Sequence, residues 1–176
     1  SRGASVASDG TIDWYCAGGL TTAPDLWRLL DDSGAALRVG PVRDGGSARR
    51  HLPPAAQSYR PGTNVLETVM EGAAGRRVSV VDVLPWPGPG LDAPGGVVRL
   101  VRALSGPVVI EVEVLPGPRR SGTVAPSGAG LVVGPIEVRA GASFAPAPLG
   151  RDTERWRAVL RLDAGEETVV TVGRRD

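Results

Sequence analysis

The amino-acid sequence predicts an all-β fold: an antiparallel two-sheet β-sandwich with one short helix. Stretches such as "VVIEVEVLPG" and "ETVVTVGRR" alternate in polarity, are rich in β-branched residues and lie between Gly, Pro or Asp-Gly punctuation. We count about twelve short strands and no alternating strand–helix units, which favours two antiparallel sheets over a parallel α/β fold. No segment repeats at a constant period, so a propeller or a solenoid is not expected.

The 176 residues are enough for one apolar core, and we expect a single β-sandwich domain over residues 1–176. Cys16 is the only cysteine, so no internal disulfide can form and a cytoplasmic location is expected. No apolar run approaches the roughly 20 residues of a membrane helix, which predicts no membrane partner. The 20 basic and 19 acidic residues are mixed along the chain, which predicts no nucleic-acid partner.

The first predicted element is a hairpin around "SDGTIDWYC". Asp9-Gly10 is a strong signal for a two-residue turn with positive φ at both positions, so Asp9 is expected to be a turn residue. Alternation along the second strand then predicts two faces: Ile12, Trp14 and Cys16 on one, and Thr11, Asp13 and Tyr15 on the other.

The single predicted helix covers residues 24–34, "PDLWRLLDDSG". Proline or aspartate can start it, Leu26, Leu29 and Leu30 form an apolar stripe, and a glycine ends it.

Strands are predicted for most of the remaining chain. They include "ALRVGPV", "TNVLETVMEG", "VSVVDVLPW", "VVRLVRALSG" and "ERWRAVLRLDAG". The Pro-rich "RRHLPPAAQSYRPG" is expected to be a connection with short extended pieces, and "PWPGPGLDAPGG" and "APAPLGRD" to be loops. Glu111 and Glu113 alternate with apolar residues, so we expect them on a solvated face of their sheet.

The sequence predicts no catalytic residue, metal or cofactor. His51 is the only histidine, which leaves no usual metal site or nucleophilic triad, and a structural role is expected for it. Asp9 and Asp13 would stand about 13 Å apart on an extended strand. That exceeds the roughly 6.5–9.5 Å between the carboxylates of an inverting glycosidase. Two further acidic pairs, Glu166-Glu167 at a hairpin tip and Asp31-Asp32 at a helix end, are poor alternatives.

Aromatic residues leave a sugar-binding surface open as an alternative. Trp14, Trp27 and Trp156 lie in periodic segments and are expected to pack in the core. Trp86 lies beside the Gly/Pro-rich loop, and together with Tyr59 it could serve a free-standing carbohydrate-binding module. A protein-interaction sandwich with no sugar role is the third possibility.

Several segments, in order, resemble the amino-terminal domain of bacterial family 15 glycoside hydrolases, the glucoamylase-like and trehalase-like proteins. These are "SDGTIDWYC", "LWRLLDD", "YRPGTNVLETVMEG", "VSVVDVLPW" and "LVRALSGPVVIEVEVLPGP", which span about the first two thirds of the chain. The resemblance implies a β-sandwich that packs on an (α/α)6 barrel. In that family the barrel carries the catalytic glutamates and hydrolyses α-linked glucosides with inversion.

By this resemblance the chain is the non-catalytic part of a larger carbohydrate-degrading enzyme, and it meets an α-glucoside substrate only through the intact protein. The matching positions expected at the barrel interface or substrate pocket are Asp13, Trp14, Asn64, Glu67, Thr68, Asp82, Pro85 and Trp86. Where the family commonly has Arg and Asp shortly after the Asp-Trp pair, this chain has Gly19 and Thr21. An apolar surface left bare without the barrel could also form a homodimer.

Overall fold

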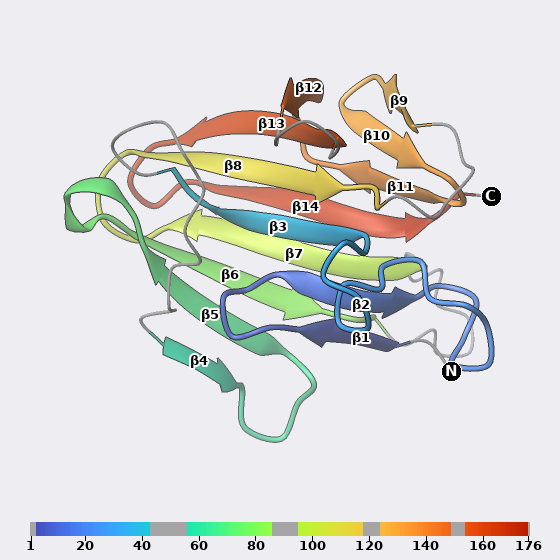
Figure 1. Ribbon diagram of the computed structural model, residues 1–176. Coiled ribbons are helices and arrows are strands. Elements are labelled where there is room, and N and C mark those ends of the chain that lie inside the picture. Colours follow the sequence, from blue (N-terminus) through green and yellow to red (C-terminus); the bar gives the residue numbers. More distant parts are fainter. Residues whose placement is uncertain (1–2, 43–55, 86–94, 118–123, 149–153, 176) are drawn as a thin grey trace.

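The alternating strands fold into two antiparallel sheets that pack face to face, which confirms the predicted β-sandwich (Figure 1). The computed structural model describes residues 3–42, 56–85, 95–117, 124–148 and 154–175. These segments hold fourteen strands, slightly more than the dozen expected. None of their helical residues forms a stretch long and apolar enough to cross a membrane.

Six strands form the first sheet, in the order β1-β2-β3-β8-β13-β12. Their bounds are β1 (Gly3–Val6), β2 (Ile12–Cys16), β3 (Ala36–Pro41), β8 (Val108–Leu115), β12 (Ala145–Pro148) and β13 (Glu154–Leu162). Strand β12 corrects the prediction that "APAPLGRD" is entirely a loop. It lies at the end of the strand order, and an edge strand tolerates proline because one side of it needs no ladder bonds.

Eight strands form the second sheet, in the order β4-β5-β6-β7-β14-β11-β10-β9. Their bounds are β4 (Ala56–Tyr59), β5 (Leu66–Glu71), β6 (Arg77–Val83), β7 (Gly96–Ala103), β9 (Val124–Ser127), β10 (Gly130–Val133), β11 (Ile136–Arg139) and β14 (Glu167–Arg174). Strands β5, β6 and β7 are consecutive antiparallel neighbours, as sequential strands usually are.

The helix predicted over residues 24–34 is wrong. The N–H groups of Asp25 and Leu26 donate to the carbonyl of Tyr15 at 2.6 and 3.2 Å, and the Tyr15 N–H donates to the carbonyl of Leu26 at 3.1 Å. The N–H of Trp27 donates to the carbonyl of Ala35 at 3.0 Å. The carbonyl of Leu26, which a helix would pair with the N–H of Leu30, is therefore used by β2, and the N–H of Leu30 donates instead to the carbonyl of Trp27 in a turn. The described residues contain only a 3-10 turn, η1 (Ala73–Gly75), at another place.

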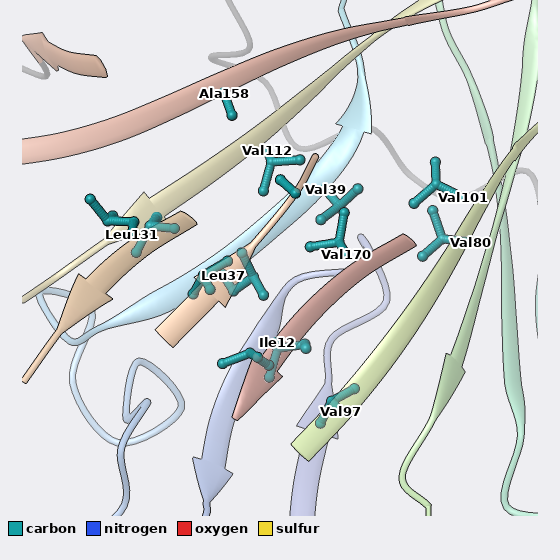
Figure 2. Close-up of a cluster of buried hydrophobic side chains, with 14 of the residues drawn as sticks. Ile12, Leu37, Val39, Val80, Val97, Val101, Val112, Leu131, Ala158 and Val170 are labelled. Carbon is teal, nitrogen blue, oxygen red and sulfur yellow. The ribbon is translucent and has the colours of Figure 1, made fainter. Parts of the chain in front are cut away.

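The apolar core lies between the sheets, built from alternate residues of their strands. Figure 2 shows side chains of both sheets gathered there, among them Ile12, Leu37, Val39, Val80, Val97, Val101, Val112, Leu131, Ala158 and Val170. Trp156 belongs to this core, as predicted, and Trp27 packs against it partly buried. Trp14 is half-buried.

Candidate functional site

Residues of three sequence motifs meet inside the sandwich, at a buried ion pair. Arg99 on β7 and Asp82 on β6 are direct cross-strand partners. The Arg99 guanidinium donates through Nε to Asp82 Oδ1 at 2.5 Å and through Nη2 to Oδ2 at 3.0 Å. Nη2 also donates to the carbonyl of Gly10, in the turn between β1 and β2. Arg99, fully buried, therefore ties the second sheet to the first hairpin.

Gln57 and Thr68 extend this connection on the same side of the second sheet. Gln57 Nε2 donates to the carbonyl of Ala7 and to Thr68 Oγ1, both at 3.0 Å. We call Gly10, Gln57, Thr68, Asp82 and Arg99 the hairpin clasp. Figure 1 shows β1 and β2 in front of β5 and β6, and these bonds establish that the two layers are in contact.

The backbone conformation of Gly10 favours glycine in the hairpin clasp, and the flexible end of Met70 packs closely over it. The φ of Gly10 is +78°, a conformation that residues with a side chain rarely adopt. A Cβ atom there would lie 2.4 Å from Cε of Met70. Glycine thus allows the turn to pack closely on the second sheet.

The turn itself differs from the one predicted. The N–H of Gly10 donates to the carbonyl of Ala7, and the N–H of Ala7 donates to the carbonyl of Thr11, which closes a three-residue loop over residues 8–10. Gly10 has positive φ but Asp9 does not. Asp9 is a turn residue as expected, since its Oδ1 accepts the N–H of Thr11 at 3.0 Å.

A β-bulge at Asp13 overturns the predicted faces of β2. Ser5 pairs with Trp14 while the next residue, Val6, pairs with Ile12, so Asp13 is the extra residue. The extra residue shifts the alternation, and Ile12 and Tyr15 both reach the core. Oδ1 of Asp13 is buried without a hydrogen-bond partner among the described residues.

The other motif residues lie elsewhere on the second sheet. Glu67 is on the opposite face of β5 from Thr68, where it accepts a 2.6 Å bond from Ser79 Oγ and lies 3.7 Å from Arg60. Asn64, in the turn before β5, donates to the carbonyl of Leu84 at 3.3 Å.

Four of the predicted site residues are thus spread over three places. Thr68 and Asp82 both belong to the hairpin clasp, where Thr68 bonds Gln57 and Asp82 bonds Arg99, whereas Asn64 and Glu67 lie outside it. Pro85 is half-buried just beyond the end of β6. Trp86 and His51 lie outside the described residues.

Acidic and basic side chains alternate across the first sheet on its face away from the core. Glu113 on β8 faces Arg38 on β3 and Arg157 on β13 in the ladder. Its carboxylate lies 3.6 Å from Nη1 of Arg38 and 3.7 Å from Nη1 of Arg155, and Arg157 pairs with Glu111. We call these five residues the charged ladder.

The charged ladder corrects the prediction that Glu111 and Glu113 are solvated. They are only 4% and 2% exposed, because arginines flank them on both neighbouring strands. The sequence does not predict this site, because the site depends on strand register. The available signal was the alternation of Arg155 and Arg157 along their strand, in the same pattern as the two glutamates.

The connection between β2 and β3 exposes large apolar side chains. Leu20, Leu29 and Leu30, which we call the leucine connection, are 59%, 58% and 71% exposed. Leu29 donates its N–H to the carbonyl of Asp13, and a Cβ at Gly3 would lie 3.1 Å from Leu20 and 3.0 Å from Trp14. The leucine connection therefore lies beside the bulged strand that carries the Asp-Trp motif.

In two of the acidic pairs considered as catalytic pairs, one carboxylate is engaged in a local turn. Oδ1 of Asp31 accepts bonds from Ser33, and Oε2 of Glu166 accepts the N–H of Asp163 at 2.7 Å. Within the described segments, no group of three or more His, Cys, Asp and Glu side chains is placed to hold a metal ion.

Comparisons with known proteins give no assignment. A scan against protein-family models finds no match, and neither a search of curated proteins nor a search of solved structures finds a significant one.

Proposed function

We propose that this chain is the non-catalytic β-sandwich domain of a family 15 glycoside hydrolase-like protein, acting on α-linked glucosides through an (α/α)6 barrel on which the sandwich packs. The leucine connection is the observation that carries this proposal. Its three leucines are more than half exposed and lie in the connection that follows the strand of the Asp13-Trp14 motif. Contiguous exposed apolar patches mark interaction surfaces, and under this proposal the three leucines belong to one such patch.

Burial of the leucine connection would contribute to domain association. Full burial of one leucine side chain stabilises by about 1.5–3 kcal/mol, so three leucines already partly buried contribute roughly 3–6 kcal/mol together. The connection is also held in place before any partner binds. A 2.8 Å bond from the Ala17 N–H to Asp25 Oδ2 and the β-bridge between Tyr15 and Leu26 hold its first part, and the bond from the Trp27 N–H to the Ala35 carbonyl, at 3.0 Å, closes its second part.

The hairpin clasp supplies the second part of the proposal. Arg99 and Asp82 position the turn at Gly10, and that turn positions β2, from which the leucine connection begins. Under this proposal the interior motif residues Thr68 and Asp82 support the interface through the hairpin rather than by touching a substrate.

An experiment on the full product of the gene tests this proposal. We expect the segment after this chain to contain an α-helical barrel, and we expect the intact protein, but not the 176-residue chain, to hydrolyse maltose or trehalose. Leu29→Ser combined with Leu30→Ser should lower the thermal stability of the intact protein. Leu104→Ser, which changes an exposed leucine in the connection after β7, is the matched control and should not.

Two results would contradict the proposal. One is hydrolysis by the isolated chain at the rate of the intact protein. The other is equal stability of the Leu29/Leu30 variant and the control, together with unchanged turnover and stability in Asp13→Ala.

A carbohydrate-binding module is the second candidate, favoured by the exposure of Tyr59, which is 65% exposed at the end of edge strand β4. Aromatic faces of this kind can stack on sugar rings. Calorimetric titration of the isolated chain with maltose distinguishes the two candidates. Saturable heat that is lost in Tyr59→Ala would support the module.

A further inference from the structure

A hollow of about 490 Å³ lies at one end of the second sheet, over β7, β14 and β11. Its floor is a cross-strand pair of glycines, Gly96 on β7 and Gly173 on β14. Beside them Val98 pairs with Thr171. Most of these residues alternate with the core residues of their strands, so the hollow opens on the face away from the core.

The two floor glycines differ in what they permit. A Cβ at Gly96 would lie 1.9 Å from the carbonyl oxygen of Val172, so close strand packing requires glycine there. A Cβ at Gly173 would meet nothing nearer than Cα of Gly96, at 3.6 Å, which is ordinary contact. Packing therefore does not demand glycine at position 173. Because glycine has no side chain, space remains open there beside residues 95–96.

The lining of the hollow is polar and carries more positive than negative charge. Its polar side chains are Ser127, Glu137, Arg139, Thr171, Arg174 and Arg175. Arg139 donates to Glu137 at 2.9 Å, so these two charges balance each other. Arg174 reaches toward the other sheet, with Nη1 3.4 Å from the Cβ position of Gly18. Arg175 is therefore the basic lining residue whose charge no described acidic residue of the hollow balances.

We propose that this hollow binds a small molecule through an oxyanion group, a carboxylate or a phosphate. Guanidinium groups bind such oxygens with charge-assisted and often bidentate hydrogen bonds. The hydroxyl of Thr171 adds a donor beside Arg139, its partner on β11. The volume falls within the roughly 300–1,000 Å³ of small-molecule sites. None of the described lining residues is aromatic, which disfavours stacking of a neutral sugar.

The test is a ¹H–¹⁵N NMR titration of the 176-residue chain at constant ionic strength, with inorganic phosphate in one arm and succinate in the other. We expect saturable shifts of the amides of Gly95, Gly96, Gly173 and Arg139, with a Kd on the order of 1–10 mM. The arm with the lower Kd identifies the preferred oxyanion.

Two variants and a control complete the test. Gly173→Val fills the hollow and Arg175→Gln removes the guanidinium that no described acid balances, and each should weaken binding by at least about fivefold. Arg102→Gln, which alters an exposed arginine of β7 outside the hollow, should leave binding unchanged. If Gly173→Val loses its dispersed spectrum, Arg175→Gln alone carries the test. Shifts that do not saturate, or equal weakening by Arg102→Gln, would overturn the proposal.

Discussion

Replacement of Asp82 by alanine tests the hairpin clasp most severely. The substitution removes both carboxylate bonds of Arg99, at 2.5 and 3.0 Å, and leaves the fully buried guanidinium with the carbonyl of Gly10. Nη1 of Arg99 already lacks a hydrogen-bond partner among the described residues. The variant therefore contains a buried charge without a counter-ion.

Breaking a buried pair in this way costs about 3–5 kcal/mol, out of a typical total of roughly 5–15 kcal/mol. For a chain of this size each kcal/mol lowers the Tm by about 2–4 °C, so we expect a decrease of about 6–20 °C. Asp82→Leu combined with Arg99→Met removes both charges. That double variant should lose much less stability, because no uncompensated charge remains.

Urea unfolding followed by tryptophan fluorescence measures these differences in the free energy of unfolding. Asp32→Ala, which changes an exposed carboxylate, is the control and should stay within about 0.5 kcal/mol of the unmodified chain. A loss below about 1 kcal/mol in Asp82→Ala would refute the role assigned to the pair. A double variant as unstable as Asp82→Ala would refute its explanation by an unpaired charge.

Three further substitutions test local features of the fold. Gly10→Ala should cost about 1–3 kcal/mol in urea unfolding, because φ is +78° and a Cβ would lie 2.4 Å from Met70; an unchanged midpoint would contradict this. Gly96→Ala should lower the Tm far more than Gly173→Ala, because its Cβ would lie 1.9 Å from the backbone of β14; equal effects in calorimetry would count against this packing. Leu30→Ser should change the stability of the isolated chain by no more than about 0.5 kcal/mol, since the side chain is 71% exposed, and a larger loss would mean that it packs within the domain.

The strands could be predicted because their alternation is local, but faces and register depend on distant partners. The apolar spacing of Leu26, Leu29 and Leu30 resembles a helix, yet Leu26 bridges β2 while the other two leucines are exposed. The bulge at Asp13 has no composition signal and shifts the faces of β2. Tertiary hydrogen bonds overrode local propensity at both places.

The hairpin clasp was only partly accessible from sequence. The sequence motifs include Thr68 and Asp82. They do not indicate that both side chains lie inside the sandwich. Arg99 was missed, although it alternates in phase with the apolar residues Val97 and Val101 of its strand. A charged residue at a core-facing position of a strand indicates a buried partner of opposite charge. Which residue is that partner follows only from the register of β6 against β7.

Hydrogen–deuterium exchange, measured on the isolated chain and on the full product of its gene, tests the proposed docking most directly. We expect backbone amides in residues 17–35 to exchange more slowly in the intact protein, with the largest change around Leu29 and Leu30, while the core of the sandwich is unaltered. Identical exchange in this segment, or a gene product without a second domain, would contradict it.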